Sequence, residues 1–137
     1  MNIIISNNEV FLRLFLSILF GGLIGLEREV VHKPAGIRTH MLVCMGSALF
    51  IIITALEIPL ELGRIIAGVA TGIGFLGAGT IFKAKSDVHG LTTAASIWVV
   101  SAVGLAIGLG YYFITMISVM FVLVILHIIR LEFFKRL

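Results

Sequence analysis

Five long apolar runs, separated by short stretches of charged or turn-forming residues, dominate the pattern of the chain. They cover roughly residues 10–26, 41–56, 65–82, 91–109 and 111–130. Because about 20 apolar residues make a helix that crosses a bilayer, each run predicts a membrane-spanning helix. The second run is short for a full span and would need residues from its flanks. The pattern therefore predicts an all-α membrane protein, a bundle of about five transmembrane helices.

The boundary between the last two runs carries no charge. Gly108, Gly110 and Tyr111 provide the turn signal there, so five spans require a very tight hairpin at this point. Four spans with a re-entrant segment are the alternative, and the sequence leaves both arrangements open.

Composition supports a membrane protein with one domain. Of the 137 residues, 60% are hydrophobic and 12% are charged, and the mean hydropathy is +1.19. Soluble domains are roughly half apolar and about a quarter charged. We expect a single transmembrane domain over residues 1–137, without a separate soluble module. The lone cysteine, Cys44, excludes an intrachain disulfide and a thiolate metal site.

The basic residues predict the orientation in the membrane. Eight of the ten lie in the loop 27–40, the loop 83–90 and the C-terminal tail: Arg28, Lys33, Arg38, Lys83, Lys85, Arg130, Lys135 and Arg136. Only Arg13 and Arg64 lie toward the other side. The positive-inside rule then places the N-terminus outside and the C-terminus in the cytoplasm, as an odd number of spans requires. Charges at span ends read as topology signals, so a nucleic-acid partner is not expected.

Small residues predict how the helices pack, since lipid supplies little force to drive helices together and close approach depends on residues with small side chains. The glycines in question are Gly21 and Gly25 in the first run, Gly68, Gly72, Gly74, Gly77 and Gly79 in the third, and Gly104 and Gly108 in the fourth. We predict that the glycine-rich third helix is central. Residues 72–77 match a dinucleotide-binding pattern, but they follow no strand and lie in an apolar run, so we reject that site.

Polar chemistry concentrates in and beside the two cytoplasmic loops. The candidate functional residues are Glu27, Arg28, Glu29, Arg38, Asp87, Thr92, Thr93 and Ser96. Glu27 needs a partner at the membrane boundary, which Arg28, Arg38 or a lysine of the second loop would supply. Alternatively, Glu27, Glu29 and Asp87 are weak candidates for a hydrated magnesium site. The sequence leaves both readings open.

The start of the fourth run is a second point of interest. Asp87 or Thr92 would cap this helix, and its N-terminus would favour an anion. Thr92, Thr93 and Ser96 either bond to carbonyls of their own helix or line a polar cleft. His32 and His40 show no zinc-ligand spacing, and we expect both at the surface. Near the outer end, Glu9 and Arg13 are four residues apart and predict an ion pair.

Several of these segments together resemble a known family. Residues 22–29 (GLIGLERE), 33–40 (KPAGIRTH), 46–50, 72–79 and 90–98 (GLTTAASIW) are similar, in order and spacing, to the MgtC/SapB family of bacterial inner-membrane proteins. The resemblance implies a hydrophobic domain of about five helices in the bacterial inner membrane. Many members continue into a soluble cytoplasmic domain, which we expect to be absent after Leu137. Members of the virulence branch tend to carry Asn at the position of Thr92.

The resemblance also implies a function linked to growth at low magnesium. It favours a regulator of another membrane protein, such as an ATPase, and the alternative is a small oligomeric transporter or channel for magnesium or another cation. We expect no enzyme, because no nucleophile–base pair or phosphate loop is evident. No cofactor is expected, apart from Mg²⁺ as a ligand or transported ion. The expected partners are the lipid bilayer, another membrane protein and further copies of the chain.

Overall fold

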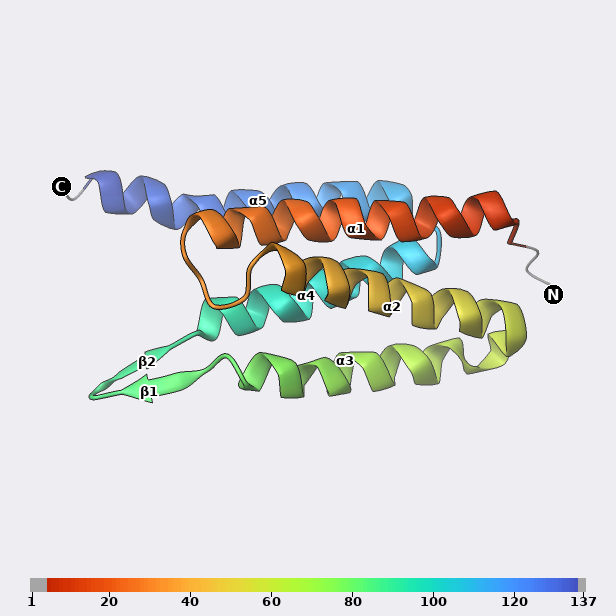
Figure 1. The fold of residues 1–137 in the computed structure, drawn as a ribbon, viewed down its shortest axis with the longest axis horizontal. Helices are drawn as coiled ribbons and strands as arrows, with labels where there is room; N and C mark the ends of the chain where they lie inside the picture. Colours follow the sequence, from red (N-terminus) through yellow and green to blue (C-terminus); the bar gives the residue numbers. More distant parts are fainter. Residues whose placement is uncertain (1–4, 136–137) are drawn as a thin grey trace.

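The computed structural model describes residues 5–135, with side chains as far as Ile128. The helices are α1 (Asn7–Val30), α2 (Ile37–Glu57), the short 3-10 helix η1 (Pro59–Glu61), α3 (Leu62–Ala78), α4 (Leu91–Gly108) and α5 (Tyr112–Lys135), and the strands are β1 (Phe82–Ala84) and β2 (Asp87–His89). Five long helices run along the bundle, and the two ends of the chain lie at opposite ends of it (Figure 1).

The predicted all-α membrane fold is confirmed. Four helices are long and apolar enough to cross a membrane, and α5 adds the apolar segment Tyr112–Ile128 within the described side chains. The loop between α1 and α2 and the β1–β2 hairpin lie at the same end of the bundle as the end of α5 (Figure 1). The basic loops predicted to be cytoplasmic therefore share one end. The side chains of Arg130, Lys135 and Arg136 lie outside the described residues.

The uncertain boundary between the last two spans is a tight turn, not a re-entrant segment. Gly110 has φ +85°, a left-handed conformation that glycine adopts without strain. Its N–H donates to the Ile107 carbonyl at 2.8 Å, and the Tyr111 N–H donates to the Ala106 carbonyl at 2.9 Å. This pair of bonds is a Schellman motif, which ends α4 and lets α5 begin at Tyr112.

The third apolar run ends earlier than predicted. Helix α3 stops at Ala78, and Phe82 belongs to a two-stranded antiparallel hairpin that replaces the predicted loop 83–90. Phe82 pairs with His89, and Ala84 pairs with Asp87. Apolar residues after α3 thus join the hairpin, because hydropathy alone cannot tell the end of a helix from a short strand.

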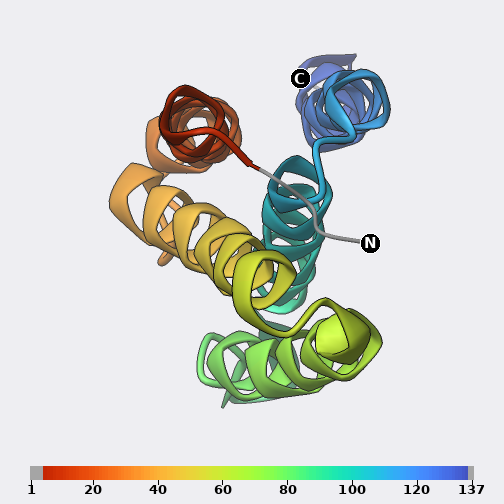
Figure 2. The ribbon, with the colours of Figure 1, turned by 90° about the vertical axis from the view of Figure 1, so that its right-hand side faces the viewer.

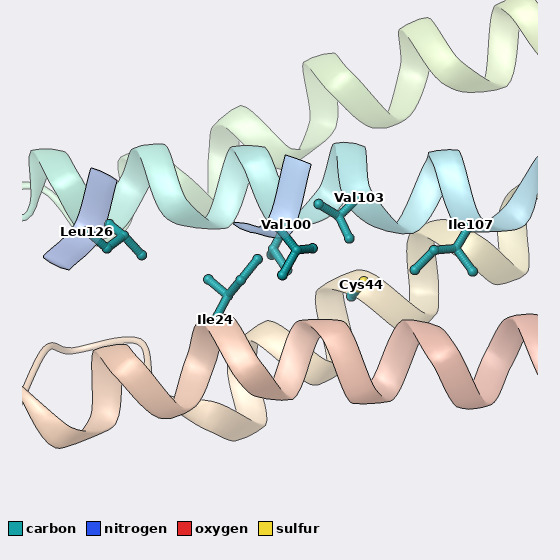
Figure 3. Close-up of a cluster of buried hydrophobic side chains, with 7 residues drawn as sticks. Ile24, Cys44, Val100, Val103, Ile107 and Leu126 are labelled. Carbon is teal, nitrogen blue, oxygen red and sulfur yellow. The ribbon is translucent and has the colours of Figure 1, made fainter. Parts of the chain in front are cut away.

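Helix α4 is the centre of the bundle. Ten of its eighteen residues are buried, and it packs against α1, α2, α3 and α5. In the view along the bundle, α4 lies between α2 and α5, and α3 lies at the edge (Figure 2). The main core cluster joins α1, α2, α4 and α5: Ile24, Cys44, Val100, Val103, Ile107, Val119 and Leu126 (Figure 3).

Helix α3 therefore does not occupy the central position predicted for it. Gly77 is its one buried residue. A Cβ added at Gly68, Gly72 or Gly74 would meet nothing within 4 Å. Small residues permit a close approach, but they do not specify which helix approaches. Glycine also offers little surface area to bury. The other helices therefore pack against α4, which has larger apolar side chains.

Glycines of α1 bring that helix close to α2. A Cβ on Gly21 would lie 2.7 Å from the carbonyl oxygen of His40, and one on Gly25 would lie 2.6 Å from the Cα of Ile37. Both obstacles are backbone atoms, so neither position accepts a side chain without moving a helix.

Glycines of α4 bring that helix equally close to α2. A Cβ on Gly104 would overlap the carbonyl oxygen of Cys44, and one on Gly108 would lie 2.7 Å from the Cβ of Ile51. Glycines of both α1 and α4 thus hold α2 closely, and this fixes the position of the polar residues at its N-terminus.

Candidate functional site

The predicted polar residues gather at the end of the bundle that carries the basic loops, where α1 ends and α4 begins (Figure 1). The structure divides them into two sets. Arg28, Thr93 and Ser96 are buried, and Glu27, the ion-pair partner of Arg28, is partly buried. The other four, Glu29, Arg38, Asp87 and Thr92, are exposed. The eight residues therefore do not form one cluster.

Arg28 and Glu27 form an ion pair at the end of α1. The Arg28 Nε donates to Glu27 Oε2 at 2.5 Å, and the two side chains are 4% and 16% exposed. Arg28 is one of the partners that the sequence left open for Glu27. Removing a charge from water is costly unless an opposite charge compensates it. The pair therefore accounts for a buried arginine at the membrane boundary.

Glu29 supports the start of α2. Its Oε2 accepts the N–H of Ile37 at 2.7 Å, and the N-cap of this helix, Gly36, offers no side-chain cap. A carboxylate is favourable at a helix N-terminus, where unpaired N–H groups carry partial positive charge. A Cβ on Gly36 would collide with this carboxylate, so a larger residue there would displace the Glu29 side chain from the start of α2.

His40 was expected at the surface, and the structure corrects this: the side chain is fully buried between α2 and α4. Its Nδ1 lies 2.9 Å from the Gly36 carbonyl oxygen, and its Nε2 lies 3.0 Å from the Ser96 hydroxyl. Helical spacing could have predicted this burial, because His40 lies on the same face of α2 as Cys44 and Ala48, which are both fully buried.

Ser96 and a second serine pair link α2 to α4. Besides contacting His40, the Ser96 hydroxyl donates to the carbonyl oxygen of Thr93 at 2.8 Å, within its own helix. Further along the same interface, the Ser47 and Ser101 hydroxyls are 3.1 Å apart, and both are buried. Sequence reasoning did not single out this second pair. Together they form a polar row between two apolar helices.

The acidic candidates for magnesium do not come together. Glu27 pairs with Arg28 and Glu29 binds the start of α2, whereas Asp87 is exposed on β2. Within the part of the chain that the structure describes, no group of three or more His, Cys, Asp or Glu side chains could hold a metal ion.

The opposite end of the bundle carries a separate polar contact. Arg13 donates to Glu9 at 2.9 Å, which confirms the predicted ion pair, and to the carbonyl oxygen of Gly108 at 2.6 Å. Glu9 also accepts the Tyr112 hydroxyl. These bonds connect α1 to α4 and α5 beside the tight turn, so their role is structural.

An apolar groove of about 530 Å³ lies between α2 and α3, and we call it the α2–α3 groove. Its lining includes Phe50 and Ser47 from α2, and Gly68, Gly72 and Leu76 from α3. A Cβ added at Gly68 or Gly72 would meet nothing within 4 Å, so the backbone of α3 is open to this space. The groove is therefore the place where another apolar chain could approach the backbone of α3 closely.

Comparison with known proteins adds a family match over most of the chain. A model of the MgtC family matches residues 14–132. No solved structure matches the chain.

The chain is 45% identical over 113 residues to the putative magnesium transporter YhiD of Escherichia coli K12, covering 76% of this chain and 53% of YhiD. It is 41% identical over 140 residues to the protein SrpB of Synechococcus elongatus, covering 91% and 74%. It is 44% identical over 101 residues to the protein MgtC of Salmonella typhimurium, covering 74% and 44%. The chain spans about half the length of YhiD and MgtC.

Proposed function

Because this chain belongs to the MgtC family and is a multi-pass protein of the bacterial inner membrane, we propose that it is a non-enzymatic regulator. In this proposal it binds another membrane protein, such as an ATPase, when magnesium is scarce. The link to magnesium rests on relatives, one of which is named a putative magnesium transporter.

The observation that carries the proposal is the α2–α3 groove. Helices associate in lipid where small residues let their backbones approach. Gly68 and Gly72 offer such a face, and neither is covered by another described part of the chain. A transmembrane helix of the regulated protein would fit this apolar surface.

The polar residues support the same proposal in another way. Glu27, Arg28 and His40 bond to other residues of the chain. Side chains bonded in this manner hold neighbouring helices in position, which is the role that the proposal requires of them.

The test replaces Gly72 with leucine and compares it with Gly74→Leu. A Cβ at either position meets nothing within 4 Å, but only Gly72 lines the groove. Tagged protein is purified from native membranes at low and high magnesium. We expect wild type and Gly74→Leu to recover the same membrane protein, and Gly72→Leu to lose it while keeping its helical circular dichroism.

Two results would contradict the regulator. One is that no membrane protein is recovered at any magnesium concentration. The other is equal recovery by Gly72→Leu and wild type, which would remove the groove from the interaction.

The second candidate is a small oligomeric transporter or channel for magnesium or another cation. The polar row between α2 and α4, formed by His40 with Ser96 and Ser47 with Ser101, favours it. Polar side chains within membrane spans often mark ion pathways. Further copies of the chain would complete the pore.

Flux into proteoliposomes separates the two candidates. Magnesium, potassium and proton fluxes are measured for wild type, Glu27→Gln, Arg28→Ala and Ser101→Ala. Flux above empty liposomes that falls in Ser101→Ala would establish transport along the polar row. Absence of all three fluxes in wild type would favour the regulator.

A further inference from the structure

A second cavity, of about 490 Å³, opens where α4 begins, and we call it the α4-end cavity. Residues from three segments surround it: His32 and Lys33 from the α1–α2 loop, Phe82 and His89 from the hairpin, and the first turn of α4. It is distinct from the α2–α3 groove and is much more polar in its lining.

The first turn of α4 presents free backbone donors to this cavity. The N-cap, Gly90, gives no side-chain cap, and the first bond within the helix runs from the Ala94 N–H to the Gly90 carbonyl. The N–H groups of Leu91, Thr92 and Thr93 have no partner among the described residues. Such groups attract an anion, assisted by the dipole of an eighteen-residue helix.

The Thr93 side chain gives an independent indication of a ligand. Thr93 is only 1% exposed, and its hydroxyl makes no hydrogen bond with the described residues, although its carbonyl oxygen accepts from Ser96. The described side chains include no polar atom that is both sealed from solvent and unpaired. The hydroxyl oxygen therefore keeps a small accessible surface, and Thr93 lines the adjoining cavity, so this hydroxyl is available to a ligand bound there.

The charged groups around the cavity are basic. Lys33 contributes an ammonium group, and the imidazoles of His32 and His89 offer N–H donors. The His89 ring is stacked on Phe82 with ring centres 5.4 Å apart, which restrains it. Asp87, two residues from His89, is exposed and does not line the cavity. An anion would thus meet donors without a facing carboxylate.

We propose that the α4-end cavity binds a phosphate group. The helix N-terminus and the Thr93 hydroxyl donate to its oxygens, and Lys33 balances its charge. The cavity lies at the end with the basic loops, which the positive-inside rule assigns to the cytoplasm. Both anionic lipid headgroups and free phosphate are found there, so the phosphate could come from either source.

The test uses the full chain in neutral detergent with two probes. The lipid probe is phosphatidylglycerol against phosphatidylcholine, with retention measured by native mass spectrometry. The soluble probe is inorganic phosphate against chloride at equal ionic strength, measured by the shift in the thermal unfolding midpoint. The variants are Lys33→Gln and Thr93→Val. Lys85→Gln is the matched control. Lys85 is an exposed lysine between β1 and β2, and it does not line the cavity.

We expect wild type to bind at least one probe. Lys33→Gln and Thr93→Val should each weaken that binding about tenfold, as loss of a hydrogen bond to a charged group does. Lys85→Gln should change it by less than about twofold. Binding of phosphatidylglycerol alone would identify a lipid headgroup, and binding of inorganic phosphate would identify a free phosphate compound.

Three results would overturn the proposal. The first is that neither probe binds wild type. The second is an equal loss in Lys33→Gln and Lys85→Gln, which would indicate diffuse attraction to the basic surface. The third is full binding by Thr93→Val, which would move the anion away from the start of α4.

Discussion

Replacing Gly104 with alanine would test the packing between α2 and α4 directly. The added methyl group would overlap the carbonyl oxygen of Cys44 and lie 2.9 Å from the Cβ of Ser47. Since the first obstacle is backbone, no side-chain rotation relieves the clash. The two helices must move apart, which also stretches the hydrogen bond between Ser47 and Ser101.

The expected effect is a loss of about 1–3 kcal/mol in the free energy of unfolding. Adding a carbon to a packed core costs about 1–3 kcal/mol. Alanine favours a helix over glycine by about 1 kcal/mol, and weakening the serine hydrogen bond costs about 1 kcal/mol. The last two contributions oppose each other, so the overpacking cost remains.

Gly72→Ala is the matched control on α3. The new Cβ meets nothing within 4 Å, so no overpacking cost applies. We expect unfolding free energy between unchanged and about 1 kcal/mol higher, because only helix propensity changes.

Unfolding is followed in mixed micelles as dodecyl sulfate is added. Trp98 is the chain's one tryptophan and lies in α4, so its fluorescence reports on the central helix, and circular dichroism reports on all helices. The reasoning fails if Gly104→Ala is as stable as wild type. It also fails if Gly72→Ala is the more damaging change, because α3 would then be the closely packed helix.

Two further predictions concern the polar contacts, and both use the same unfolding assay. Glu27→Gln leaves Arg28 buried without its partner and should cost about 3–5 kcal/mol, whereas the double change with Arg28→Met should recover most of that loss. If the double variant stays as unstable as Glu27→Gln, the pair does more than balance charge. Ser96→Ala removes the partner of His40 Nε2 and should cost about 1–3 kcal/mol, and a neutral result would show that this bond contributes nothing.

The helices could be predicted because bilayer thickness dictates the length of an apolar run. That constraint is local, and it located all five helices, whereas the turn at Gly110 was one of two arrangements that the sequence left open. The hairpin escaped prediction because three-residue strands leave no periodic pattern. The identity of the central helix was predicted wrongly for a different reason. The glycines of α3 indicate that another helix can approach closely, but they do not indicate which helix does.

In the candidate site, too, contacts between neighbours in sequence could be predicted, and contacts between distant residues could not. Glu27 and Arg28 are adjacent in sequence, so their pairing was among the readings that the residues allowed. His40 and Ser96 are 56 residues apart, and their contact depends on how α2 packs on α4. A histidine between apolar helices needs a partner, but the sequence does not identify which residue on another helix provides it.

The weak packing of α3 has a consequence for motion within the bundle. Only Gly77 of this helix is buried, while α1, α2 and α4 are joined by glycine contacts and buried polar bonds. Local opening begins where few buried contacts must break. In hydrogen exchange, the amides of α3 should lose protection before those of α4. Helix α3 and the hairpin attached to it thus form a part of the chain that can rearrange while α1, α2 and α4 stay assembled.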